Sequence, residues 1–166
     1  MIRSARGYHR RVVWTAGDPP RPRPVLLAKA EVLELTGAWP EAEALHRNDC
    51  ELSPAGGGDA AGAARCLARL LMKRGAYDEA RPLLVAARGY FETSGDRRRL
   101  FGCHMDLGQL LRRQGQPDAS DAEYDAGLTI ARGLGDHSLE SHALLDLGIN
   151  RYTRGDFSAA ELHYIW

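Results

Sequence analysis

The sequence predicts an all-α fold, an α-solenoid in which antiparallel helix hairpins stack on one another. The first observation is a periodicity: four similar segments carry the glycines Gly37, Gly75, Gly115 and Gly155, spaced by 38, 40 and 40 residues. Repeats of this length are typical of stacked helical arrays. The second observation is composition. Aromatic residues make up only 7% of the chain, whereas strand-rich folds favour aromatic and β-branched side chains.

Residues of fixed type surround these four glycines, which we call the turn glycines. A ring stands two residues after each of them, at Trp39, Tyr77, Pro117 and Phe157. Small residues stand five residues after them, at Ala42, Ala80, Ser120 and Ala160. Small residues also stand seven residues before them, at Ala30, Ala68, Gly108 and Gly148. Small residues at matching places let two helices of a hairpin approach closely, and one hairpin cannot bury its apolar face alone, so the hairpins must stack.

A second glycine series alternates with the turn glycines and separates the hairpins. It consists of the dipeptides Gly58-Asp59, Gly95-Asp96 and Gly135-Asp136. Glycine adopts the left-handed conformation that ends a helix, and aspartate caps the helix that follows. The spacing therefore predicts helices over residues 25–36, 40–52, 59–74, 78–93, 97–114, 118–133, 137–154 and 157–166.

These residues resemble tetratricopeptide (TPR) repeats, in the long variety of about 40 residues carried by bacterial signalling ATPases, transcription regulators and kinesin light chains. The resemblance covers residues 25–166 and implies a right-handed solenoid of about four repeats, the last incomplete. The first repeat is degenerate, because Lys29 stands where the others have leucine. We expect repeats at about 25–58, 59–95, 96–135 and 136–166.

The two ends of the chain carry their own expectations. Residues 1–24 hold six arginines, one acid and alternating Pro and Arg, which favours an extended, solvated segment. It is either a linker or an arm for an acidic protein, a nucleic acid or a proline-recognising partner. The fourth repeat stops in the middle of its second helix. Either the chain is a segment of a larger protein, or this end pairs with another copy. The apolar residues for such self-association are Leu162, Tyr164, Ile165 and Trp166.

No motif predicts catalysis, a metal site or a cofactor. The run Gly56-Gly57-Gly58-Asp59 lacks the lysine and the hydroxyl residue of a phosphate-binding Walker loop. No two histidines stand four residues apart, as a helical metal site would require. The cysteines Cys50, Cys66 and Cys103 form no C-x-x-C motif, so neither a zinc knuckle nor a disulfide framework is indicated. We expect no enzyme activity and no cofactor.

In the family that the sequence resembles, the first helix of each repeat lines a concave groove that binds partners. Aligned on the turn glycines, the resemblance implies a groove formed by Arg65, Arg69, Met72, Lys73, Met105, Gln109, Arg112, Arg113, His142, Leu145, Ile149 and Tyr152. These positions include five cations and no carboxylate, and Glu31 and Glu34 add opposing charge at one end. Arg65 and Arg69 are the best candidates for partner contact, because the other cations lie in last turns, where they also satisfy helix carbonyls.

The resemblance implies a protein–protein interaction scaffold or sensor in the cytoplasm, within a larger bacterial signalling or transcription regulator. Its expected ligand is an acidic or amphipathic peptide, because arginine pairs with carboxylates. The alternative is a non-catalytic piece of a multidomain enzyme, such as a TPR-bearing ATPase or nucleotide cyclase. A nucleic-acid partner is disfavoured by the balance of 22 basic and 22 acidic side chains. A membrane span needs about 20 consecutive apolar residues, and the apolar runs of this sequence are only a few residues long. The sequence therefore excludes a membrane span.

Overall fold

A computed structural model describes residues 23–53 and 56–155, and within these ranges the chain is all-α. The helices, in order, are α1 (Arg23–Leu35), α2 (Trp39–Leu52), α3 (Gly58–Lys73), α4 (Tyr77–Ser94), α5 (Arg97–Arg113), α6 (Pro117–Leu134) and α7 (His137–Thr153). Each begins and ends within two residues of the predicted range, which confirms the predicted helices up to residue 153. The predicted helix over 157–166, with Leu162, Tyr164, Ile165 and Trp166, lies outside the described residues, as does most of the predicted arm.

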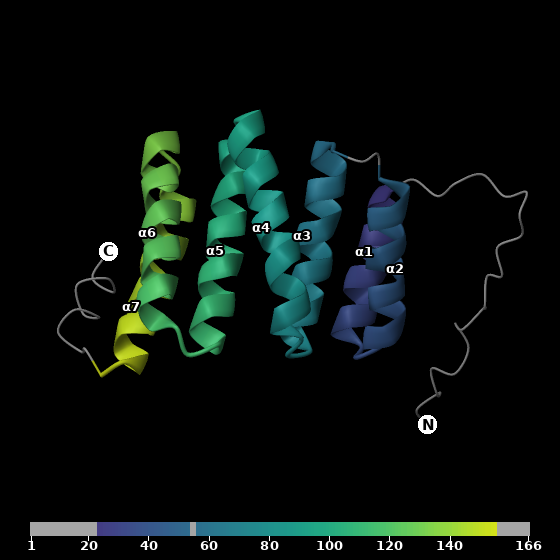
Figure 1. The fold of residues 1–166 in the computed structure, drawn as a ribbon, viewed down its shortest axis with the longest axis horizontal. Coiled ribbons are helices and arrows are strands. Elements are labelled where there is room, and N and C mark those ends of the chain that lie inside the picture. The colour runs from purple at the N-terminus through teal and green to yellow at the C-terminus, as the bar shows by residue number, and fades with distance from the viewer. Residues whose placement is uncertain (1–22, 54–55, 156–166) are drawn as a thin grey trace, which may run out of the picture.

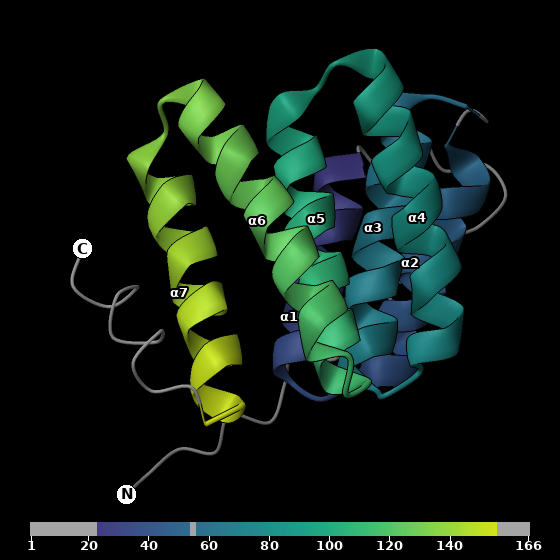
Figure 2. The ribbon, with the colours of Figure 1, turned by 60° about the vertical axis from the view of Figure 1, so that its left-hand side comes forward.

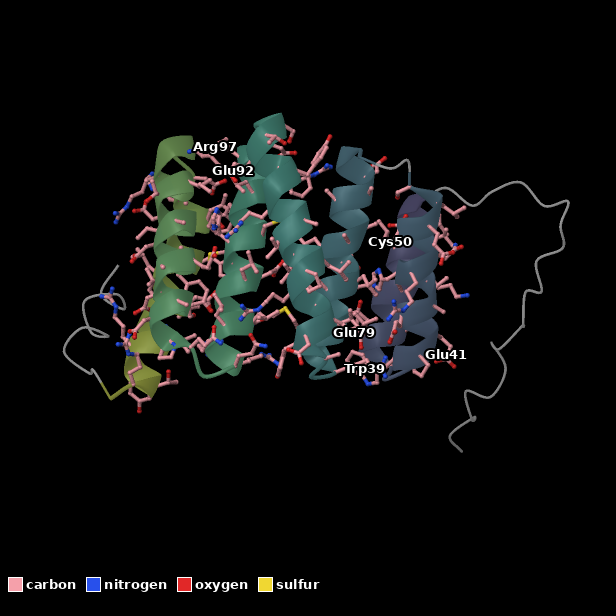
Figure 3. All side chains as sticks on the ribbon, in the orientation of Figure 1. Trp39, Glu41, Cys50, Glu79, Glu92 and Arg97 are labelled. Atoms are coloured by element: carbon pink, nitrogen blue, oxygen red, sulfur yellow. The ribbon has the colours of Figure 1, made fainter. Side chains whose placement is uncertain are left out.

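The helices form antiparallel pairs that stack from α1–α2 at one end to α7 at the other (Figures 1 and 2). Each helix packs against its neighbours in sequence, and the first helices also contact one another, α3 with α5 and α5 with α7. The first helices therefore form one layer of a helical solenoid, as predicted. Figure 3 shows Trp39 and Glu79 near one edge of this stack and Glu92 and Arg97 at the opposite edge.

The turn glycines form the same turn in each hairpin. Gly37, Gly75 and Gly115 have φ values of 78°, 80° and 72°, a left-handed conformation that glycine adopts without steric cost. The amide that follows each of them donates to the carbonyl five residues earlier, at 2.9 Å, in the pairs Ala38–Leu33, Ala76–Leu71 and Gln116–Leu111. This bond is typical of a helix that ends on a left-handed glycine. The hairpins consequently share one geometry.

The second glycine series matches the prediction at two of its three positions. Gly95 and Gly135 are left-handed, and the carboxylates of Asp96 and Asp136 accept backbone N–H bonds at the starts of α5 and α7. The prediction for Gly58-Asp59 was wrong. Gly58 is the first residue of α3 and Asp59 lies in its first turn, while the left-handed glycine of this loop is Gly56. The run of three glycines moves the turn two residues upstream of the predicted position.

Small residues bring the two helices together in the three hairpins that the structure describes in full, as predicted. Ala30 and Ala42, Ala68 and Ala80, and Gly108 and Ser120 are all buried. In the third hairpin the Ser120 hydroxyl donates to the Gly108 carbonyl at 2.8 Å, and the fully buried Tyr124 ring lies against Gly108, where a Cβ would meet it. Side chains larger than these would hold the helices apart and expose the apolar core between them.

Replacing Gly108 with alanine tests this close approach. The added methyl group overlaps the Tyr124 ring, so we expect Gly108→Ala to lower the free energy of unfolding by about 1–3 kcal/mol. The control is Gly89→Ala, because Gly89 lies inside α4 with no atom within 4 Å of its Cβ position. That variant should gain up to about 1 kcal/mol of stability from helix propensity. Urea unfolding followed by circular dichroism measures both, and a stabilised Gly108→Ala would contradict the packing described.

Candidate functional site

The predicted groove residues lie on the first helices. Arg65, Arg69 and Lys73 come from α3, Gln109, Arg112 and Arg113 from α5, and His142 and Tyr152 from α7. Arg69, Lys73, Arg113, His142 and Tyr152 are exposed, and the other three are half-buried. We call the side of the stack that carries them the first-helix face. A role of these residues in partner binding stays a prediction, but their contacts show how their charges are balanced.

Asp106 of α5 joins the two arginines that the sequence singled out on α3. The Nε of Arg65 donates to Asp106 Oδ2 at 2.6 Å, and the Nε of Arg69 lies 3.9 Å from Oδ1. Burial raises the pKa of the Asp106 carboxyl, and the attraction of Arg65 and Arg69 offsets this only in part. Arg65 is thus part of the contact between two stacked repeats, whereas the Arg69 side chain remains 54% exposed. We call this group the Asp106 bridge.

Glu34 of α1 forms a second bridge, to Lys73 of α3. The Lys73 Nζ donates to Glu34 Oε2 at 2.5 Å, and His46 Nε2 of α2 lies 3.0 Å from Glu34 Oε1. Burial by itself raises the pKa of Glu34, but the hydrogen bonds and charges of Lys73 and His46 outweigh it and hold that pKa below its usual value. Glu34 is therefore ionised at neutral pH and compensates the charge of Lys73.

Asp146 stands on α7 at the register position that Asp106 occupies on α5. Its Oδ2 lies 3.4 Å from His142 Nε2. Burial raises the pKa of Asp146, with partial compensation from His142 and Arg112. The His142 ring also lies 6.0 Å from the Phe101 ring of α5, at a tilt of 60°. His142 is consequently fixed between its own helix and the preceding repeat.

The structure corrects two expectations about this face. Met72 and Met105 are buried, with 2% and 4% exposure, because their register points them into the packed core instead of the groove. Asp106 and Asp146 bring carboxylates that the sequence reasoning missed, so the face is mixed in charge and not simply basic. Both aspartates stand nine residues before a turn glycine, and this shared register is the signal that identifies them.

A pocket of about 680 Å³ opens on the first-helix face between the first and second hairpins. We call it the junction pocket. It is lined by Leu27, Ala28, Glu31, Glu34 and Leu35 of α1, Trp39 and His46 of α2, and Cys66, Arg69 and Lys73 of α3. Its volume is within the range of about 300–1,000 Å³ that ligand pockets occupy. The structure thus brings together Arg69, Lys73, Glu31 and Glu34 from the predicted groove.

The C-terminal part of the chain also matches a known family. Residues 100–165 fit the sequence profile described as "Tetratricopeptide repeat". This match coincides with the repeats that the turn glycines define and with the solenoid of helix hairpins. Residues 100–165 are therefore similar to tetratricopeptide repeats. No curated protein sequence matches it.

Several solved structures share the fold. BtubC (BKLC) from P. vanneervenii has a TM-score of 0.73 at 17% identity, covering 85% of this chain and 59% of BtubC. The Rap conjugation gene regulator of the plasmid pLS20, in complex with the Phr* peptide, has a TM-score of 0.73 at 14% identity, covering 84% of this chain and 40% of the regulator. A kinesin-light-chain-like protein of Podosopora anserina with nearly identical TPR-like repeats has a TM-score of 0.73 at 15% identity, covering 88% and 74%.

These comparisons show that the described helices share the fold of known helical-repeat solenoids. At such low identities the likeness is one of fold. The chain spans 59% of the length of BtubC and 40% of the length of the Rap regulator. None of the described helices combines the length and apolar character that crossing a bilayer requires, and the same residues contain no cluster of three or more metal-ligating side chains.

A third bridge joins two successive repeats away from the junction pocket. Glu123 of α6 accepts a bond from Arg88 NH1 of α4 at 2.7 Å, and its other oxygen lies 2.7 Å from His104 Nδ1 of α5. Burial by itself raises the pKa of Glu123, but the hydrogen bonds and charges of His104 and Arg88 prevail and lower it. The ionised carboxylate therefore stabilises the folded array.

This lowered pKa predicts a pH dependence of stability. Because the pKa of Glu123 is lower when folded, its contribution is fully present above the unfolded value and is lost as pH falls through the folded pKa. We expect Glu123→Gln to cost about 1–3 kcal/mol near neutral pH and progressively less below about pH 4.5. Thermal unfolding from pH 7 to pH 3 measures this, with exposed Glu92→Gln as the control. A cost that is constant across that range would contradict the assignment.

Proposed function

We propose that the chain is a protein–protein interaction module that binds an amphipathic peptide segment of a partner along its first-helix face. Tetratricopeptide arrays are protein-interaction repeat modules, and this chain has their fold. The observation that carries the proposal is the junction pocket, which opens on the first-helix face and combines apolar and charged walls. The setting we propose is the scaffold or sensor part of a larger cytoplasmic signalling or transcription regulator in bacteria.

The charges of the first-helix face favour an amphipathic ligand over a strongly acidic one. Lys73 is compensated by Glu34, and Arg65 by Asp106. Apolar surface is present beside the remaining charges, at Leu27, Leu35 and Trp39 in the junction pocket. A ligand that covers apolar surface and supplies a few charges at its edge suits this arrangement, because apolar burial gives affinity and charge pairing gives specificity.

The similarity to the Rap regulator supports this use of the fold. That protein, which is a regulator of conjugation genes, was solved with the Phr* peptide bound. The Phr* peptide is a ligand of the Rap regulator, and the regulator resembles this chain in fold. The same architecture is therefore compatible with peptide binding, which is the property we propose here. That the chain has no enzyme activity of its own stays a prediction.

Charge reversal at the pocket tests the proposed function. We expect Arg69→Glu to weaken binding of a peptide, selected from a random library on the wild-type chain, by about tenfold, which corresponds to about 1.4 kcal/mol. The Arg69 side chain is more than half exposed but lies 3.9 Å from Asp106, so circular dichroism must first show that the variant has the helicity of the wild type. Fluorescence anisotropy of the labelled peptide measures the affinity.

The matched control is Arg97→Glu, which reverses an exposed arginine at the edge marked in Figure 3. It changes the net charge by the same amount as Arg69→Glu. Arg97 follows all the residues that line the junction pocket in the sequence. We expect it to leave peptide affinity within about twofold, because exposed charges more than about 10 Å apart are largely screened at 0.1 M salt. Equal losses in both variants would show a general charge effect and would contradict binding at the first-helix face.

A further inference from the structure

The junction pocket lies between α1 and α3, where the contact between repeats differs from the contact between α3 and α5. Nine residues before successive turn glycines stand Ala28, Cys66, Asp106 and Asp146. At the junction of α3 with α5, Asp106 reaches across to Arg65 and Arg69, which stand ten and six residues before Gly75. These three positions form the Asp106 bridge.

The same three positions are chemically different at the junction of α1 with α3. Cys66 stands in place of the aspartate, and Leu27 and Glu31 stand in place of the two arginines. No ion pair can form between a thiol and these side chains, and all three residues line the junction pocket. At this junction, therefore, apolar and acidic groups stand at the positions that form the Asp106 bridge at the next one.

The wall of the pocket on α2 also contains a residue, His46, that differs in type from the residues at the same register position in the next two repeats. His46 stands nine residues after its turn glycine, at the position of the buried Leu84 and Tyr124 in the next two repeats. Its side chain is 6% exposed, and its Nδ1 has no hydrogen-bond partner in the described part of the chain. A polar core position beside a pocket is unusual in an otherwise apolar register.

Two opposite charges remain at the pocket after the internal bridges are counted. Glu34 and Lys73 compensate each other at 2.5 Å. Glu31 and Arg69 both line the pocket, but no ion pair within 4.0 Å joins these two described residues. Glu31 is exposed, and Arg69 makes only the long contact of 3.9 Å to Asp106. Apolar Leu27, Leu35 and Trp39 line the same pocket.

We propose that the junction pocket binds an apolar side chain of a partner peptide, flanked by a cationic group that pairs with Glu31 and an anionic group that pairs with Arg69. This inference rests on the proposed function and specifies its ligand. Charge complementarity carries it, because among the described residues the pocket offers an acid, Glu31, with no ion pair, a base, Arg69, with only one long ion pair, and apolar surface between two helices. A purely acidic peptide would be repelled by Glu31, and a purely basic peptide would be repelled by Arg69. Either is therefore expected to bind more weakly than a peptide with both charges.

Selection of peptides on charge-reversed variants tests the proposal. The probe is a displayed library of random dodecapeptides, selected in parallel on the full wild-type chain, on Glu31→Lys, on Arg69→Glu and on the control Glu51→Lys. On the wild type and the control we expect peptides with one basic and one acidic residue around an apolar residue. Glu31→Lys should select peptides in which the basic residue is replaced by an acidic one. Arg69→Glu should select peptides in which the acidic residue is replaced by a basic one.

A compensating exchange then gives the effect in numbers. Glu31→Lys should bind the best wild-type peptide about tenfold more weakly, and replacing the basic residue of that peptide with glutamate should restore the affinity. Should Arg69→Glu unfold because of its proximity to Asp106, Arg69→Gln takes its place, with loss of the acidic preference as the expected result. Circular dichroism shows which of the two is folded.

The outcomes separate the inference from the proposed function. Peptides enriched on all four proteins with the same charge composition would overturn the charge assignment and leave peptide binding intact. Enrichment of no peptide on any of them would contradict both. A solution mass that falls from dimer to monomer in Glu31→Lys would show that a second copy of this chain occupies the pocket, which also overturns the proposal.

Discussion

The close approach of two helices within each hairpin is the contact on which the rest of the structure depends. It occurs at pairs of small buried residues, such as Ala68 with Ala80 and Gly108 with Ser120. Because these positions recur at the same distances from the turn glycines, every hairpin presents the same shape to the next. A helical stack built from equivalent hairpins then places the first helices in one layer, and this layer forms the surface on which the candidate site lies.

Within that regular frame, the contacts between successive repeats differ, and the binding site that we propose lies at one of these differences. The Asp106 bridge fills the space between α3 and α5 with a buried ion pair. Between α1 and α3 the same positions hold Cys66, Leu27 and Glu31, and a pocket opens there. The repeats can therefore share one backbone arrangement while the side chains at a junction differ, and the pocket lies at such a junction. The degenerate first repeat, in which Lys29 stands where the others have leucine, contributes α1 to this junction.

The sequence predicted the helices well because their limits are set locally. A left-handed glycine ends a helix through backbone conformation alone, so Gly37, Gly75 and Gly115 sufficed to place the hairpins. The site was less accessible to such reasoning. The pairing of Arg65 with Asp106 joins residues 41 positions apart and depends on how one hairpin stacks on the next. Met72 was wrongly assigned to the groove because a rotation of about 100° per residue separates a groove position from a core position on a helix, and an apolar side chain is acceptable at both.

Alkylation of Cys66 is the measurement that tests the central claim most directly, because this thiol lines the junction pocket. Burial raises the pKa of the Cys66 thiol, so the reaction with iodoacetamide is best followed by mass spectrometry at mildly alkaline pH. We predict that a saturating selected peptide slows the alkylation of Cys66 severalfold and leaves the rate at Cys50, which does not line the pocket, unchanged. An unchanged rate at Cys66 with the peptide bound would place the ligand elsewhere and contradict the account.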